Sequence, residues 1–428
     1  MNIHIKNGRV IDPANKIDAR QDLFITDDKI VAVGSAPASF NADRVIDATG
    51  LIVAPGLIDL AARLREPGFE YRATLESEME AAMAGGITSL ACPPDTDPVL
   101  DEPGLVEMLC FRAKNLNCAH VYPVGALTVG LKGQSITEMA ELVEAGCVAF
   151  SQANTPLVDT QVLLRAMQYA ATFGFRVWLQ PTDPFLGKGG MAHDGEMASR
   201  MGLTGIPVEA ETVALATHLK LAQATGVKLH VTRLSSAAGL ALIDEARAAG
   251  VDVTCDVAAH HLHLCDIDIG YFNPLCHMEP PLRSQRDRDA LSAGLADGRI
   301  NAVCSDHTPV DDDAKQMPFG ESEVGATGLE LLLPLTLKWA RDNKVPLPDA
   351  LARITADAAG IMGITKGGHL GVGARADVCV FDADAERIIT RATLKSQGKN
   401  TPFLGMPLPG ITRFTLVEGR VMFESDAQ

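Results

Sequence analysis

The sequence lacks three features that would each point to a class of protein. No apolar run approaches the roughly 20 residues of a bilayer-spanning helix, so no membrane span is expected. The nine cysteines are scattered singly and residues 1–10 hold no apolar signal core, which predicts reduced thiols in a cytoplasmic protein. Basic residues are outnumbered, 37 against 54 acidic ones, and the formal charge of −17 disfavours nucleic acid and anionic membranes as partners.

Several catalytic signatures are also absent. There is no phosphate-binding Walker loop, no dinucleotide fingerprint and no Gly-x-Ser-x-Gly elbow, so the enzyme classes built on them find little support. What the chain does have is length and apolar content: 428 residues, 47% of them hydrophobic. That is too long for one ordinary core, but one large barrel domain with a smaller accessory domain would account for it.

From Gly56 onward, apolar strand candidates alternate with amphipathic helix candidates such as 208–224, as in parallel β/α units. Eight such strands with intervening helices fit a TIM-type (β/α)8 barrel, whose site lies at the carboxyl ends of the strands. The predicted strands are 57–60, 88–91, 121–126, 147–151, 176–180, 228–232, 252–257 and 301–304.

The two ends of the chain have a different pattern of polar and apolar residues. Residues 1–55 alternate polar and apolar residues around turn signals, and after predicted helices at 331–341 and 348–362 the alternation returns at 377–381 and 414–417. We therefore expect 1–55 and 366–428 to form one small β-sandwich domain beside a barrel of residues 56–365. Within the barrel, the glycine-rich stretch 184–205 is the predicted mobile loop.

Several motifs resemble the dihydroorotases, which are cyclic amidohydrolases. They are Ala54-Pro55-Gly56-Leu57-Ile58-Asp59-Leu60, Leu64-Arg65-Glu66-Pro67-Gly68, Pro280-Pro281-Leu282-Arg283, Ser305-Asp306-His307-Thr308-Pro309, Gly328-Leu329-Glu330 and Gly398-Lys399-Asn400-Thr401-Pro402-Phe403. The resemblance covers nearly the whole chain. It implies an amidohydrolase barrel that, in active members, opens and closes the dihydroorotate ring in pyrimidine synthesis with bound metal.

The resemblance also implies six metal-ligand places: a His-x-His after the first strand, a carboxylate, two later histidines and a final aspartate. Imidazole and carboxylate suit these places because both offer lone pairs. An arginine guanidinium has no free lone pair, stays protonated and repels a divalent cation. At the six places the sequence has Ala61, Arg63, Gln152 (with Ala153 beside it), Gln180, Arg233 and, as the only retained ligand, Asp306.

Of the residues that the resemblance assigns to substrate binding, this sequence has some and lacks others. Arg65 matches the family's substrate-carboxylate clamp, although it would serve equally well as a structural arginine at the barrel mouth. Asp95 and Glu279 stand where the family commonly has asparagine, and each adds a charge that would repel an anionic substrate. His261 and His263 form a second His-x-His pattern that could bind a metal ion. The resemblance implies, however, that active relatives carry similar histidines here without using them as ligands.

Three hypotheses follow. The first is a catalytically silent dihydroorotase homologue, without cofactor, that serves as a structural subunit of aspartate carbamoyltransferase in homo- and hetero-oligomers; that partner is implied by the resemblance alone. The second is an active cyclic-amide hydrolase of dihydroorotase, hydantoinase or allantoinase type with an altered metal site, which either acts on another cyclic amide or uses a metal at His261, His263 and Asp306. The third is a sensor with an anion pocket at Arg63, Arg65 and Arg233. Under the first, we predict that Arg63 or Arg233 pairs with Asp306.

Overall fold

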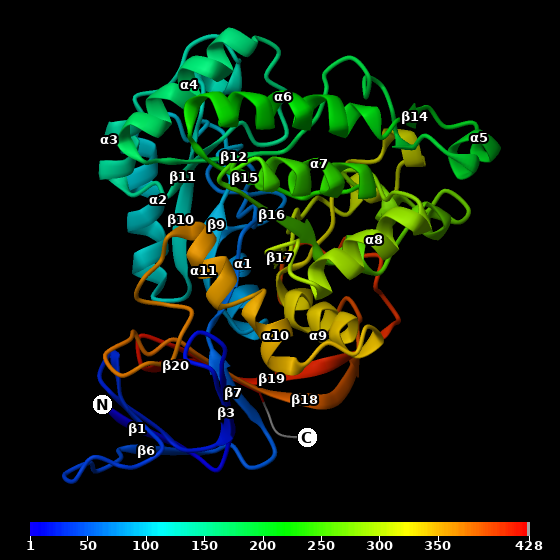
Figure 1. The fold of residues 1–428 in the computed structure, drawn as a ribbon. Helices are drawn as coiled ribbons and strands as arrows, with labels where there is room; N and C mark the ends of the chain where they lie inside the picture. The colour runs from blue at the N-terminus through cyan, green and yellow to red at the C-terminus, as the bar shows by residue number, and fades with distance from the viewer. Residues whose placement is uncertain (426–428) are drawn as a thin grey trace.

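The computed structural model describes residues 1–425 and has a sheet of eight parallel strands at its centre (Figure 1). Each strand pairs with the next one along the chain in the sheet order β8-β9-β10-β11-β12-β15-β16-β17. The predicted (β/α)8 barrel is confirmed, and every predicted barrel strand overlaps an observed one. The strands are β8 (Leu57–Asp59), β9 (Ile87–Cys92), β10 (His120–Ala126), β11 (Ala149–Ser151), β12 (Arg176–Leu179), β15 (Lys228–Val231), β16 (Val253–Ala258) and β17 (Ala302–Cys304).

The barrel is closed by backbone bonds just beyond the ends of its first and last strands. The amide of His307 donates to the carbonyl of Ala61 at 3.0 Å, and the amide of Arg63 donates to the carbonyl of His307 at 2.9 Å. These bonds lie at the carboxyl ends of β8 and β17. They bring Arg63 beside Asp306, although the two are 243 positions apart in sequence.

Helices surround the barrel strands (Figure 1). The predicted helix 348–362 is wrong as a single element, because it is interrupted at residues 353–355. There the Thr355 hydroxyl donates to the carbonyl of Leu351 at 2.6 Å, a local side-chain bond that competes with helix continuation. The helices are α1 (Leu75–Ala84), α2 (Pro103–Leu116), α3 (Met139–Ala145), α4 (Thr160–Phe173), α6 (Glu209–Thr225), α7 (Ala237–Ala248), α8 (Gln285–Ala296), α9 (Leu332–Asp342), α10 (Leu347–Ala352) and α11 (Ala356–Met362).

The two ends of the chain form the β structure at the bottom of Figure 1, as predicted. A six-stranded sheet has the order β20-β19-β18-β7-β2-β3, in which N-terminal β7 pairs with C-terminal β18, and a four-stranded sheet has the order β5-β4-β1-β6. Fully buried aliphatic side chains from both ends of the chain share one core, including Ile3, Ile25, Val53, Val380 and Leu416.

The strands of these two sheets are β1 (Asn2–Lys6), β2 (Arg9–Asp12), β3 (Ile17–Arg20), β4 (Leu23–Thr26), β5 (Lys29–Val33), β6 (Arg44–Asp47), β7 (Ile52–Pro55), β18 (Val378–Ile388), β19 (Pro407–Val417) and β20 (Arg420–Glu424). The turn between β19 and β20 is Glu418-Gly419, and both residues have positive φ, as a tight hairpin turn requires. The predicted sandwich range 366–428 includes residues 426–428, which lie outside the described part of the chain.

The stretch 184–205 carries more secondary structure than a bare loop. It contains α5 (Glu196–Met201) and a short parallel pair of strands, β13 (Ala192–His193) and β14 (Gly205–Ile206). Among the described residues 1–425, none of the helices is both long and apolar enough to cross a bilayer.

Candidate functional site

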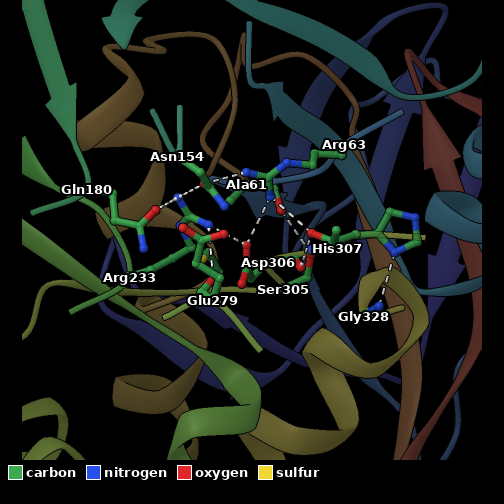
Figure 2. Close-up of polar contacts among 12 residues, drawn as sticks. Ala61, Arg63, Asn154, Gln180, Arg233, Glu279, Ser305, Asp306, His307 and Gly328 are labelled. Atoms are coloured by element: carbon green, nitrogen blue, oxygen red, sulfur yellow. Dashed lines mark hydrogen bonds and ion pairs between the residues drawn. The ribbon is translucent and has the colours of Figure 1, made fainter. Parts of the chain in front are cut away.

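Charged side chains from separate strand ends converge at the carboxyl end of the barrel (Figure 2). Arg63 follows β8, Asp95 follows β9, Arg233 follows β15 and Asp306 follows β17. We call these four residues the mouth cluster. Asp306, Arg63 and Arg233 are each 5% exposed or less, whereas the Asp95 side chain is 27% exposed.

Arg63 has acceptors on all three nitrogens of its guanidinium group. Nε donates to Asp95 Oδ2 at 2.7 Å, and Nη2 donates to Asn154 Oδ1 at 2.7 Å. Nη1 donates to Thr308 Oγ1 at 3.0 Å and more distantly to Asp306 Oδ1 at 3.3 Å. A buried cation that bridges two carboxylates in this way has a firmly fixed position.

Arg233 approaches Asp306 from the opposite side (Figure 2). Its Nη1 lies 3.1 Å from Asp306 Oδ1, the same oxygen that Arg63 contacts. Its Nη2 donates to Asn154 Oδ1 at 2.7 Å and to Gln180 Oε1 at 2.6 Å. The prediction that at least one arginine pairs with Asp306 is therefore confirmed, and both do.

The mouth cluster is balanced in charge, with two guanidinium groups facing two carboxylates. Burial would lower the pKa of Arg63, but the attractions of Asp95 and then Asp306 outweigh it and raise the pKa above its ordinary value. Burial would likewise raise the pKa of Asp95, yet Arg63 holds it below the usual range. The pairing of Arg63 with Asp95 therefore favours the charged form of both side chains.

Asn154 was not singled out as a site residue by the sequence, and it is central. Its Oδ1 accepts from both arginines, whereas Gln152, which stands at the expected carboxylate place, points elsewhere. Gln152 Nε2 donates to Thr128 Oγ1 at 2.8 Å and to the carbonyl of Leu131 at 2.9 Å. Gln152 therefore lies outside the mouth cluster, and Asn154 is the residue of this segment that reaches both arginines.

Arg65 and Ala61 complete the set of predicted site residues. Arg65 is 8% exposed, and its Nε donates to the carbonyl of Pro309 at 2.9 Å. Burial and then the like charge of Arg63 lower the pKa of Arg65 to about 10. Ala61 is 6% exposed, and its methyl group offers neither a ligand nor a hydrogen bond.

The backbone at the barrel mouth is held in an unusual conformation. Arg65, Ala153, Arg233 and Asp306 all have φ between 47° and 62°, a region that side chains other than glycine seldom adopt. Such a conformation costs on the order of 1–3 kcal/mol per residue, and it clusters at functional sites. The loops at this end of the barrel therefore have the geometry of a site.

A second polar group lies directly behind the mouth cluster and joins β8 to β17. The Asp59 carboxylate accepts from the Ser305 amide at 2.8 Å and from the Ser305 hydroxyl, and burial raises its pKa to about 6. His307 Nδ1 accepts from the Gly328 amide at 3.0 Å, so its Nε2 carries the proton and donates to Glu78 at 2.6 Å. We call Asp59, Ser305, His307 and Glu78 the support network.

The alternative histidine pair does not form a joint ligand set. His261 and His263 lie in and just after the short 3-10 helix Ala259–Leu262, not on one face of a strand. The Nε2 of His261 lies 3.2 Å from the carbonyl of Pro281, and that of His263 lies 2.9 Å from the carbonyl of Leu335. Within residues 1–425, no group of three or more His, Cys, Asp or Glu side chains could hold a metal ion.

The residues at the mouth do not fit the metal centre that the resemblance implies. Asp306 is the only carboxylate kept at a ligand place, and its Oδ1 already accepts from two guanidinium groups. A divalent cation beside Asp306 would face the positive charges of Arg63 and Arg233, neither of which can coordinate it.

Comparisons with known proteins agree with the barrel. Residues 50–238 match the Dihydro-orotase-like family model, and residues 335–423 match the Amidohydrolase family model. The chain is 45% identical over 99% of its length to the whole of a dihydroorotase-like protein of Pseudomonas aeruginosa. It is 39% identical, with 99% of this chain and 100% of the relative covered, to a dihydroorotase of Geobacter sp. strain M21.

Solved structures give the same fold. L-hydantoinase from Arthrobacter aurescens superposes with a TM-score of 0.89 at 25% identity, covering 99% of this chain and 96% of that one. Dihydropyrimidinase from Brevibacillus agri superposes with a TM-score of 0.82 at 22% identity, with coverage of 99% and 95%.

Proposed function

The chain belongs to the dihydroorotase-like family of the amidohydrolases, and from that premise we propose that it is a non-catalytic member. In this proposal it is a cytoplasmic structural subunit that assembles with aspartate carbamoyltransferase in pyrimidine biosynthesis. The observation that best supports a non-catalytic role is the pairing of Arg63 and Arg233 with one oxygen of Asp306.

The energetics support this proposal. A catalytic zinc lowers the pKa of its water from 15.7 to about 7, which corresponds to roughly 12 kcal/mol. A positioned general base contributes only about 10² to 10⁴ fold, or roughly 3–5 kcal/mol. Asp306, tied between two arginines, could not replace the metal in hydrolysing an unstrained amide.

The partner follows from the family resemblance, in which degenerate members assemble with aspartate carbamoyltransferase. The test is to co-express both chains and measure their masses by size exclusion with light scattering. We expect one mixed oligomer. An Asp306→Asn variant should assemble equally well, because the proposal assigns assembly to the surface and not to the barrel mouth. Two separate peaks would contradict the partnership.

An active hydrolase is the runner-up, and the 39% identity to a protein called dihydroorotase favours it. Turnover of dihydroorotate, a hydantoin or allantoin by protein purified without chelator would establish it. Loss of that turnover in Asp306→Asn would exclude a contaminating enzyme as its source.

A sensor role has one specific observation in its favour. The only protein hydrogen bond of the Arg65 side chain, within the described residues, is the one from Nε to a backbone carbonyl. Its two terminal nitrogens are thus free to bind an anion. A rise in melting temperature with dihydroorotate or carbamoyl aspartate that disappears in Arg65→Met would favour the sensor over a purely structural subunit.

A further inference from the structure

Helix α6 has an outer face that the described residues leave exposed. The helix lies near the top of the molecule in Figure 1, packed beside α4 and α7. Its buried residues, which include Leu215 and Leu219, lie on the opposite side of the helix. Spacings of four, three and four residues place four exposed side chains in a single row along the outer face. The row consists of Glu209, Val213, Ala216 and Lys220.

The row is continuous with further exposed apolar side chains at the N-terminal end of α6. Val213 is 46% exposed, and Phe185 and Leu186 are 71% and 44% exposed. The two latter residues follow Asp183, whose amide donates to the carbonyl of Ala210 in the first turn of α6 at 2.7 Å. Asp183 Oδ1 also accepts from the amides of Phe185 and Leu186 at 2.9 and 2.8 Å. Large apolar side chains that gather on one exposed face mark a protein contact surface.

The charges at the two ends of the row are opposite, and neither is paired. Among residues 1–425, neither Glu209 nor Lys220 has an oppositely charged group within 4.0 Å. Lys220 Nζ donates to the neutral Gln223 Oε1 at 3.4 Å. At 1.5 Å of helix rise per residue, the two charged residues are roughly 16 Å apart along the axis, so they do not pair with each other.

This arrangement makes the row complementary to itself. When a second α6 lies antiparallel to the first, the acidic end of each helix faces the basic end of the other. In the same register, Val213 of each helix faces Ala216 of the other, whose small side chain lets the two helices approach closely. A two-fold axis produces both matches at once, because the same surface is used on both copies. A partner of one charge sign would match only one end of the row.

We propose that α6 docks against α6 of a second copy of this chain, in an antiparallel dimer related by a two-fold axis. Glu209 of each copy pairs with Lys220 of the other, and Val213 packs on Ala216. Phe185 and Leu186 extend the apolar contact beyond the N-terminal end of each helix. This dimer forms without the carbamoyltransferase, so its presence or absence in the isolated chain is separate from the proposed assembly role.

The test measures the mass of the full chain alone by size exclusion with light scattering over a dilution series. We expect twice the chain mass of 45.4 kDa, with dissociation on dilution. Val213→Glu, at an exposed position, should raise the dissociation constant at least about tenfold, because it places two like charges in the apolar centre of the contact. Glu209→Lys should weaken the dimer by a similar factor, about tenfold, because it turns two attractions into two repulsions.

Charge exchange then identifies the register. Glu209→Lys combined with Lys220→Glu should restore dissociation to within about threefold of wild type, because the ends are again opposite in sign. Glu80→Lys, an exposed charge reversal on α1, is the matched control and should leave the dimer unchanged. Wild type that is monomeric throughout the series, or a dimer that Val213→Glu and Glu209→Lys leave unchanged, would overturn the proposal. A monomeric chain in which Val213→Glu instead blocks assembly with the carbamoyltransferase would assign this face to that partner and also overturn it.

Discussion

The mouth cluster and the support network are neighbouring polar groups that share the ends of β8 and β17, and they have different chemistry. The support network consists of carboxylates that accept from neutral donors, and it includes the Ser305 and His307 that flank Asp306 in the motif shared with dihydroorotases. The mouth cluster is made of guanidinium–carboxylate pairs. The resemblance implies lone-pair donors facing this aspartate in active members, whereas in this structure two guanidinium groups face Asp306.

The comparison predicts that the largest stability effect lies in the support network. Glu78→Ala should lower the free energy of unfolding by about 3–5 kcal/mol, because it leaves the buried donor His307 Nε2 and the part-buried amide of Gln397 without acceptors. Urea denaturation followed by circular dichroism measures this. Glu80→Ala, at an exposed position of the same helix, is the matched control and should change stability by less than about 0.5 kcal/mol. Equal effects of the two variants would contradict the role of the network.

Asp59 should give the support network a characteristic pH dependence. Its pKa is raised to about 6 in the folded protein, so the stability it contributes is fully present below pH 3.8 and is lost as pH rises toward 6. Asp59→Asn can keep the bonds to Ser305 and cannot titrate. The stability of wild type relative to Asp59→Asn should therefore fall by about 2 kcal/mol between pH 4 and pH 6.5. A flat difference over that range would show that Asp59 is not protonated on folding.

A double-mutant cycle on the mouth cluster should give a smaller effect. Arg63→Met and Asp306→Asn are each expected to destabilise the protein, and their coupling free energy should be about 1–3 kcal/mol, because the two side chains contact each other directly. Pairing either change with Glu80→Ala is the control and should give additive effects. A coupling free energy near zero would mean that the ion pair does not stabilise the mouth.

Much of the fold was predictable because it follows from local patterns. Apolar runs bounded by turns marked all eight barrel strands. The residues facing Asp306 were also predictable, since strand ends converge in a barrel and Arg63 and Arg233 each follow such a strand.

The orientations and partners of several site side chains could not be predicted from the sequence, because they depend on backbone turns and long-range contacts. Spacing cannot decide which of residues 151–154 points into the barrel mouth; the positive φ of Ala153 turns the chain there, and Asn154 reaches both arginines while Gln152 does not. Asp95 looked like a repulsive charge in the sequence, but in the structure it is a partner of Arg63.

We propose that guanidinium groups stand where the resemblance places the metal ions of active members, and the metal content of the protein tests this most directly. The protein should be purified without chelator from zinc-supplemented cells and its zinc measured by plasma mass spectrometry, with Asp306→Asn as the comparison. We predict less than about 0.1 zinc per chain in both proteins, because Arg63 and Arg233 repel a divalent cation. Stoichiometric zinc in wild type that is lost in Asp306→Asn would contradict the account.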